Sequence, residues 1–395
     1  MFSNSVQSTW AQWKADFTTA VHQRNATALA QSLTAFVSDD TVDALRNSQY
    51  AGVDIGAFAD VASEYNKYIN SNLDVMHAAY SRVVNAFAHQ SVLQEDWMIA
   101  TLRLLCSDLT ALALQDNDPQ RNASNSVNTL DLFSKLASIF FNEINRDSSK
   151  IGSRGRSFFV PVYFSFRICF KLNELTRCPK IIEQVDLVLN LVDSSEFPSA
   201  DFVTYNYWLG RLRLINHEFE DADRSLSVAW TGCPDHYPRQ KRQILLYLTA
   251  TRLVLGKPPS SQLLQDYNLD GLFGDLISAA SVGNFAEYEH LLQMRCTWLM
   301  RYRLYGIMKY RLKVAMFRNL MKNTWMALNQ TRTISFWQFW NACVFAGAAN
   351  FTIEDAECIL VTLVDLGYMK GYLNHAKGVV VLSASPFPPM YEVYK

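Results

Sequence analysis

Hydrophobic positions recur at helical spacing through the first 290 residues, and short polar linkers separate one such stretch from the next. Residues 96–114, DWMIATLRLLCSDLTALAL, are apolar on nearly every side of a helical projection, which predicts a central, buried helix. In SFFVPVYFSFRICFKLNEL, Pro161 should start or kink a helix, because proline has no amide hydrogen to donate. The pattern therefore predicts a helical N-terminal part.

One segment, YNYWLGRLRLINHEFEDADRSLSVAW, has the residue order of a helix hairpin of the tetratricopeptide type. A bulky Trp208 precedes Gly210, which permits two helices to approach closely, and the second helix carries Phe219, Ala222 and Leu226. The same design recurs loosely in RQILLYLTATRLVLGKPPSSQLL. Repeated helix pairs of this kind stack into a solenoid, in which each pair covers its neighbour.

After about Thr331 the pattern changes to short strands and short helices. RTISFWQFWNACVFAG is a strand-like lead into a helix, and TIEDAECILVTLVDLG is a helix with Thr352 and Asp355 at capping-box spacing. YMKGYLNHAKGVVVLSA then predicts two strands around a turn at residues 374–378. Strand, helix, helix and hairpin in this order indicate a winged helix, and the proline-rich SPFPPM cannot continue as helix.

These patterns predict a mainly α protein, a right-handed tetratricopeptide-like solenoid of helical repeats that ends in a C-terminal winged helix. We expect four parts along the chain. They are N-terminal helices at 1–95, helical repeats at 96–300, a connector helix plus winged helix at 301–385, and a proline-rich tail at 386–395.

The composition argues against several function classes. Seven cysteines are widely spaced and form no C-x-x-C pair, which favours reduced thiols in the cytosol or nucleus over disulfides or zinc. We find no run of 18 uncharged apolar residues and no secretory signal pattern. Phosphate-binding and H-E-x-x-H motifs are missing, and the seven histidines have no ligand spacing. We therefore expect neither catalytic residues, nor a metal site, nor a cofactor.

The charge is distributed unevenly, although the chain as a whole is nearly neutral. From His290 to Ile353 there are nine Lys and Arg residues and no acid, which leaves 27 basic against 37 acidic residues elsewhere. Within RYRLYGIMKYRLKVAMFRNLMKNTW, a continuous helix would place Arg311, Arg318 and Lys322 on one narrow arc. Each cation alone could simply lay its aliphatic stem over apolar neighbours. Their collective excess predicts an anionic neighbour, either phosphate or an acidic peptide.

The predicted second helix of the winged helix carries Glu354, Asp355, Glu357 and Asp365, and these carboxylates would repel phosphate. Nucleic-acid contacts should therefore come from the preceding basic segment and from the wing, mainly to phosphate and with little sequence selectivity. The candidate contact residues are Arg301, Arg303, Lys309, Arg311, Lys313, Arg318, Lys322, Arg332, Lys370, His375 and Lys377.

Two further clusters are candidates for partner binding. The cations Arg239, Lys241 and Arg242 precede a predicted helix and could meet a helical partner, an acidic peptide or a neighbouring acidic helix. The aromatic run FWQFW could form a base-stacking platform, or it could pack the winged helix onto the solenoid. Any exposed remainder, at Trp337 or Trp340, would suit a protein partner.

Several phrases resemble PCI-domain proteins, in which helical repeats are followed by a C-terminal winged helix. The phrases are VYFSFRICFKLNELTRCPKII, VTYNYWLGRLRL, KRQILLYLTATRLVLGKPPSSQLLQDYNL, FRNLMKNTW and LGYMKGYLNHAKGVVVLSASPFPP. They resemble the branch that contains the PCI subunit of the transcription-coupled mRNA-export complex and its sister, which is similar to the twelfth signalosome subunit. The resemblance spans roughly residues 96–389.

The resemblance implies a non-catalytic nuclear scaffold, with the cytoplasm as a second location. Its partners would be a large helical protein of the Sac/GANP type, which carries a PCI-like region, and a small, acidic, disordered peptide of the proteasome-lid type. RNA and DNA would bind jointly with the helical partner, and no membrane is involved. The alternative is a purely protein-binding subunit of a signalosome- or lid-like assembly. The shared phrases do not distinguish the export branch from its sister.

Overall fold

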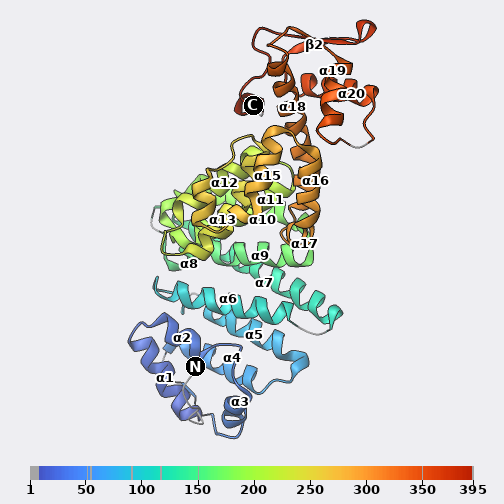
Figure 1. Cartoon of the computed structure of the whole chain (residues 1–395). Coiled ribbons are helices and arrows are strands. Elements are labelled where there is room, and N and C mark those ends of the chain that lie inside the picture. Colours follow the sequence, from blue (N-terminus) through green and yellow to red (C-terminus); the bar gives the residue numbers. More distant parts are fainter. Residues whose placement is uncertain are drawn as a thin grey trace. The chain divides into compact units, whose positions relative to one another are not determined.

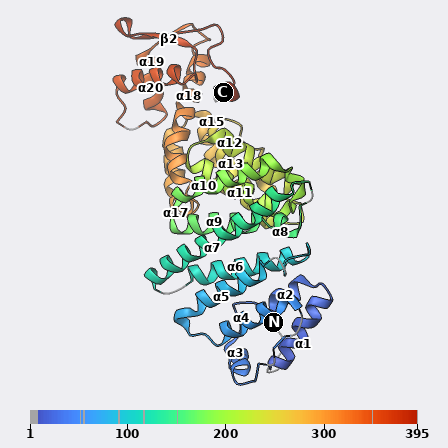
Figure 2. The same cartoon turned by 180° about the vertical axis from the view of Figure 1, so that it is seen from behind.

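The computed structural model describes residues 9–50, 52–53, 56–89, 92–115, 118–149, 151–348 and 350–393. The chain forms two compact units, Met1–Trp208 and Leu209–Lys395, and their boundary falls inside helix α11 (Ser199–Ile215). Both units are built mainly from helices (Figures 1 and 2). None of the helices in the described ranges combines the length and the hydropathy that a membrane span requires. The predicted divisions at residues 95, 300 and 385 stay predictions.

The first unit consists of helices that lie in successive layers from α4 to α9 (Figure 1). Its elements before α11 are α1 (Trp10–His22), α2 (Ala26–Ser32), α3 (Asp39–Arg46), η1 (Gly56–Phe58), α4 (Ala59–Ile69), α5 (Leu73–Phe87), α6 (Met98–Leu114), α7 (Pro119–Arg146), α8 (Ser153–Arg156), α9 (Phe159–Leu172), η2 (Leu175–Arg177), α10 (Cys178–Leu191) and η3 (Ser194–Glu196). Helix α6 packs against α2, α5, α7 and α9, which confirms the predicted central helix. Pro161 lies in the first turn of α9, where its missing N–H costs no helical hydrogen bond.

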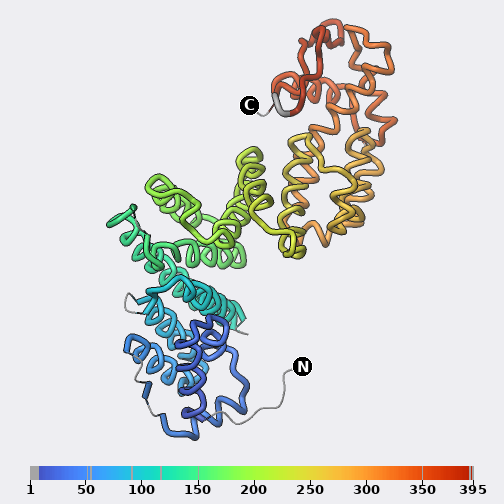
Figure 3. The backbone as a smooth tube through the Cα atoms, turned by 90° about the vertical axis from the view of Figure 1, so that its left-hand side faces the viewer, coloured from blue at the N-terminus to red at the C-terminus, as the bar shows by residue number. Residues whose placement is uncertain are grey.

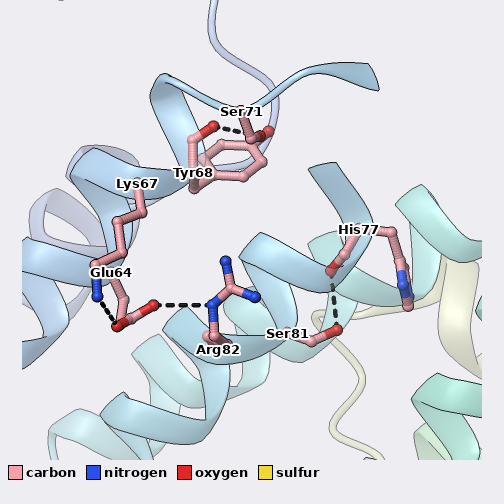
Figure 4. A network of polar contacts seen from close by, with 7 residues as sticks. All are labelled: Glu64, Lys67, Tyr68, Ser71, His77, Ser81 and Arg82. Atoms are coloured by element: carbon pink, nitrogen blue, oxygen red, sulfur yellow. Dashed lines mark hydrogen bonds and ion pairs between the residues drawn. The ribbon is translucent and has the colours of Figure 1, made fainter. Parts of the chain in front are cut away.

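Aromatic rings fill the core of the N-terminal helices. The ring of Trp13 stacks on both Phe17 and Tyr65, with centroids 4.9 and 5.5 Å apart. Between α4 and α5, Glu64 accepts from Lys67 and from Arg82, and this ion-paired cluster lies at the surface (Figure 4). Such pairs contribute little to stability individually, so apolar burial holds these helices together.

A buried ion pair joins α6 to α11 inside the first unit. Arg103 donates from Nε and Nη2 to the two carboxylate oxygens of Asp201, over 2.8 and 2.9 Å. Asp201 is only 1% exposed, and the paired carboxylate raises the pKa of Arg103 despite partial burial of the guanidinium. The two-point geometry fixes the register of the two helices as well as their approach.

The second unit begins with the hairpin predicted from the sequence. Gly210 in α11 meets Leu226 in α12: a Cβ added to Gly210 would lie 2.5 Å from Leu226 Cγ. Only glycine fits there, which confirms the predicted close approach. Antiparallel helix pairs then follow one another along the unit (Figure 3). Its helical elements up to the winged helix are α12 (Phe219–Gly232), α13 (Pro238–Val254), α14 (Ser261–Asp266), α15 (Asp270–Val282), α16 (Phe285–Met294), α17 (Cys296–Arg301), the π-helical turn η4 (Ile307–Arg311) and α18 (Leu312–Ala327).

The winged helix lies at the end of the second unit, as predicted. A three-stranded antiparallel sheet has the order β1-β3-β2, with Ile334 opposite Val380 and Tyr372 opposite Val381. Its elements are β1 (Thr333–Ser335), α19 (Phe336–Phe345), α20 (Ile353–Asp365), β2 (Gly371–Asn374), η5 (His375–Lys377), β3 (Val379–Leu382) and the short α21 (Met390–Val393). The architecture of helical repeats ending in a winged helix is thereby confirmed.

Residues 383–390, which overlap the predicted proline-rich tail and are called the tail below, run back over the second unit. Ser383 donates to the main-chain oxygen of Lys370, and the amide of Lys370 donates to Pro386. The Phe387 ring lies 5.6 Å from the Trp325 ring of α18. Met390 reaches the turn after α13, where its side chain leaves no room for a Cβ on Gly256. The tail thus connects the winged helix, α18 and the repeat hairpins.

Candidate nucleic-acid interface

The basic stretch from Arg301 to Trp325 is not the continuous helix that its sequence predicts. Helix α17 ends at Arg301, and Arg303 then takes a left-handed backbone conformation with a φ of 59°. The π-helical turn η4 follows before α18 begins at Leu312. A π turn accommodates one residue more than an α turn, so it changes the direction of every later side chain relative to the earlier ones. A single helical projection of the stretch is therefore wrong.

The predicted arc of exposed cations at Arg311, Arg318 and Lys322 is wrong at Arg318. Its side chain is buried, and Nη2 donates to the main-chain oxygen of Pro388 over 2.7 Å, while the guanidinium lies 5.9 Å from the Phe387 ring. Burial lowers the pKa of Arg318. Because the tail covers this guanidinium, Arg318 does not present its charge to a ligand in solution. Arg311 and Lys322 are exposed.

Three other candidate residues already have charged or aromatic neighbours. Lys313 forms an ion pair with Glu289, which lies one residue before the acid-free segment begins. His375 Nδ1 lies 2.7 Å from Glu357 Oε1, so the acidic helix α20 contacts the wing directly. The ammonium of Lys309 lies 5.5 Å from the centroid of Tyr305, and the two tyrosines beside it raise the pKa of Lys309. These exposed contacts are weak individually, and salt screens them.

Six candidate cations remain exposed and have no side-chain hydrogen bond or ion pair to any residue that the structure describes. They are Arg301, Arg311, Lys322, Arg332, Lys370 and Lys377. They come from the end of α17, from η4 and α18, from the approach to β1, from the approach to β2 and from the wing. All belong to the second unit. We call these six residues the open cations.

Helix α20 has the acidic character that the sequence predicts. Thr352 Oγ1 accepts from the amide of Asp355 over 3.2 Å, and Asp355 Oδ2 accepts from the amide of Thr352 over 2.9 Å. This reciprocal pair is the predicted capping box, and it explains Asp355 without any ligand. Glu354 is exposed beside it. That α20 does not read a major groove stays a prediction.

The basic cluster proposed for partner binding is mostly used within the chain. Lys241 is buried, forms an ion pair with Asp235 and lies 4.7 Å from the Trp230 ring. Arg242 donates from Nε to the main-chain oxygen of Tyr267 over 3.0 Å, which ties α13 to the turn after α14. Both cations are therefore engaged within the chain, and their contact with a partner stays a prediction. Arg239 is exposed and remains a candidate.

The aromatic run of α19 divides between core and surface. Phe336 and Phe339 are buried, and Trp340 donates from Nε1 to the main-chain oxygen of Phe351 over 2.7 Å, which places it inside the winged helix. Trp337 is 59% exposed, and Phe345 at the end of the same helix is 95% exposed. Phe345 was not among the predicted contact residues. The local sequence marks it only by its position, as a bulky apolar residue directly before the Ala346-Gly347 pair that ends the helix.

Candidate metal ligands do not come together in the described residues. No group of three or more His, Cys, Asp or Glu side chains there is arranged to hold a metal ion. The seven cysteines are free thiols, and Cys358 alone among them is exposed. What the described part of the chain offers is a set of dispersed cations and an exposed apolar edge on a helical frame.

Fold and surface together define a class of protein, a helical-repeat scaffold that ends in a winged helix. No family model matches the chain. It is similar to "PCI domain-containing protein 2 homolog" of Drosophila melanogaster, 28% identical over 306 residues that cover 76% of this chain and 75% of the relative. "PCI domain-containing protein 2" of Danio rerio is 33% identical over 229 residues, covering 58% and 56%.

A plant relative extends over more of the chain. "Enhanced ethylene response protein 5" of Arabidopsis thaliana is 27% identical over 372 residues, which cover 92% of this chain and 87% of the relative. The matched region of the Danio relative spans little more than half of that protein's length. These similarities support the placement of the chain among PCI-domain proteins.

Proposed function

We propose that the chain is a non-catalytic scaffold subunit of a nuclear complex that links transcription to mRNA processing or export. The helical-repeat fold with its winged helix and the similarity to proteins named for a PCI domain support the scaffold role. The observation that carries the nucleic-acid part is the set of six open cations in the second unit, four of which lie between His290 and Ile353, where the sequence lacks acids.

The proposed contact is with phosphates along a strand. The open cations are dispersed over several elements instead of lining one helix face, and α20, which would be the reading helix of a winged helix, carries carboxylates. Contacts of this kind position a strand without reading its bases, so binding is weakly selective and falls steeply with salt. A partner with its own winged helix would extend the same surface.

We propose two protein partners, a large helical protein of the Sac/GANP type and a small acidic peptide of the lid type. The exposed edge of α19 formed by Trp337, Val344 and Phe345 is suited to a protein partner, since an isolated domain gains nothing from exposing these side chains together. Arg239, exposed in the first turn of α13, suits an acidic peptide. The nucleus is the proposed location, with the cytoplasm as a second one.

The experiment is purification of the full chain from its own cells, with identification of the co-purifying proteins by mass spectrometry. A gel shift of the same preparation with single-stranded RNA accompanies it. The proposal predicts a large helical partner, a small acidic chain and an RNA shift that disappears as salt is raised. A preparation with those partners that never shifts RNA would contradict the nucleic-acid role.

A second candidate function is a purely protein-binding subunit of a signalosome- or lid-like assembly. The 95% exposure of Phe345 favours it, because that edge needs a protein and not a phosphate. In that case the Phe345→Asp variant should lose its large partner, and RNA binding should be absent with the natural sequence.

A further inference from the structure

A hollow of about 420 Å³ lies in the second unit, where the turn after α11 meets the π-helical turn η4. Its volume falls within the range of small-ligand pockets, roughly 300 to 1,000 Å³. The lining side chains that matter for its chemistry are Ile215, His217, Arg303, Ile307, Tyr310 and Arg311. We call this hollow the η4 pocket.

Three basic side chains line the η4 pocket, those of His217, Arg303 and Arg311, and no carboxylate is among its lining residues. Arg311 is one of the open cations. The pKa of His217 is lowered, first by desolvation and then by the positive charge of Arg311. Glu218, the neighbouring acid along the chain, accepts from Asn216 Nδ2 over 3.4 Å. Two guanidinium groups and an imidazole around one hollow are donors suited to phosphate oxygens.

The backbone conformation around the η4 pocket also indicates a functional site. His217 and Arg303 have φ angles of 67° and 59°, and each follows the end of a helix, where glycine or asparagine is the usual residue. Basic side chains stand there despite the cost of a left-handed conformation. Between Arg303 and Arg311 the chain forms η4, and π turns are found frequently at functional sites. Strain and irregular helix thus coincide at one hollow.

Tyr310 adds an aromatic surface to the η4 pocket, which binding of a phosphate group alone does not require. Its ring is 66% exposed beside the two arginines, and the ammonium of Lys309 lies 5.6 Å from its centroid. An exposed ring next to phosphate donors is the arrangement by which proteins hold single strands, because an unpaired base can stack on the ring. Bases in a duplex are already stacked on one another and cannot do so.

We propose that the η4 pocket receives one unpaired nucleotide of a single strand, with its phosphate against Arg303 and Arg311 and its base against Tyr310. This inference rests on the proposed function and adds to it a strand preference and a defined contact. The pocket lies among the helical repeats, before α18 and outside the winged helix, so it extends the nucleic-acid surface away from the wing.

The test uses the full chain and fluorescence anisotropy with two probes, a labelled 12-nucleotide oligouridylate and an RNA duplex of 12 base pairs. The variants are Tyr310→Ala, Tyr310→Phe and Arg311→Ala. Tyr237→Ala, at a tyrosine 49% exposed elsewhere in the unit, is the matched control. Circular dichroism melting confirms that each variant is folded.

We expect Tyr310→Ala to weaken binding of the oligouridylate about fivefold or more, with little effect on the duplex. Tyr310→Phe and Tyr237→Ala should bind like the natural sequence, and Arg311→Ala should lower the salt slope for the single strand by about 0.7. Equal loss for both probes, or no loss with Tyr310→Ala, would overturn the inference while leaving the proposed function intact. Failure of the chain to bind either probe at low salt would overturn the inference, and failure of the natural complex to shift RNA as well would overturn the nucleic-acid role.

Discussion

Arg318 donates a hydrogen bond from Nη2 to the main-chain oxygen of Pro388, 70 residues further along the chain, over 2.7 Å. The bond holds the tail on α18 and buries a guanidinium without a carboxylate partner among the described residues. Buried charges require compensating hydrogen bonds, so this contact couples the folding of the tail to that of α18. It also separates Arg318 from the open cations.

We expect reversal of charge at Arg318 to destabilise the fold strongly. Arg318→Glu places a carboxylate against the Pro388 oxygen in a buried site and should cost more than about 3 kcal/mol in the free energy of unfolding. Lys322→Glu, one helical turn later on the same helix but exposed, should change it by less than about 0.5 kcal/mol. Urea denaturation of both variants measures the difference. Similar free energies of unfolding for the two variants would contradict a structural role for the buried hydrogen bond between Arg318 and Pro388.

The ion pair between Arg103 and Asp201 gives a second prediction. Asp201→Asn leaves a partly buried guanidinium without its counter-charge and should cost about 3 kcal/mol. Asp186→Asn, at an exposed position of α10, is the matched control and should be nearly neutral. Thermal and urea unfolding are the measurements. A neutral result at Asp201 would mean that solvent or another group replaces the pair.

The close approach at Gly210 predicts that an added methyl group destabilises the fold and that shortening Leu226 relieves part of this effect. Gly210→Ala forces a methyl group against Leu226 and should cost about 1 to 3 kcal/mol through overpacking. Gly271→Ala, where a Cβ meets nothing within 4 Å, should be neutral or slightly stabilising. Combining Gly210→Ala with Leu226→Ala should cost less than the sum of the two single changes. Simple additivity in that double-mutant cycle would argue against the close approach.

His77 predicts a pH dependence of stability. Its Nε2 lies 2.7 Å from Thr129 Oγ1, and burial lowers the pKa of His77 to about 4. The unfolded chain, with an ordinary pKa of about 6.5, therefore takes up the proton more readily, so stability falls as pH drops from about 6.5 to 4. The loss of stability between neutral pH and pH 4 is about 3 kcal/mol. Unfolding of His77→Gln across this range should show a flatter profile, and an unchanged slope would contradict the assignment.

Local patterns predicted the parts of the fold that local interactions determine. The hairpin around Gly210, the capping box of Thr352 and Asp355, and the two strands about residues 374–378 all follow from neighbouring residues, and the structure confirms them. Gly210 is constrained by its contact with the next helix along the chain, and the capping box by the backbone of its own turn, so neither depends on a distant segment.

The candidate site was harder to predict, because contacts with residues outside the basic segment decide which of its cations are exposed and which are buried or paired. Pro388 buries Arg318 from 70 positions away, and Glu289 pairs with Lys313 from just beyond the acid-free window. The π turn at η4 also shifts the helical phase, for which no residue in the stretch gives a signal. Sequence periodicity cannot report any of these effects, so it identified the basic segment but not its accessible members.

The central claim is that the open cations of the second unit bind nucleic-acid phosphates, and one measurement tests it most directly. The salt dependence of single-stranded RNA binding is compared for the natural complex and for a triple variant with Lys322, Lys370 and Lys377 changed to Glu. A control triple changes the exposed Lys135, Lys171 and Lys257 to Glu, which alters the net charge equally.

Loss of three phosphate contacts should weaken RNA binding at least tenfold and lower the slope of log affinity against log salt by about two units. The control triple should bind within about threefold of the natural complex, since its lysines lie outside the open cations. Equal weakening of RNA binding by the two triple variants would mean that net charge, and not the position of the lysines, causes the effect. Unchanged affinity and slope in the first triple, with both proteins folded, would contradict the account.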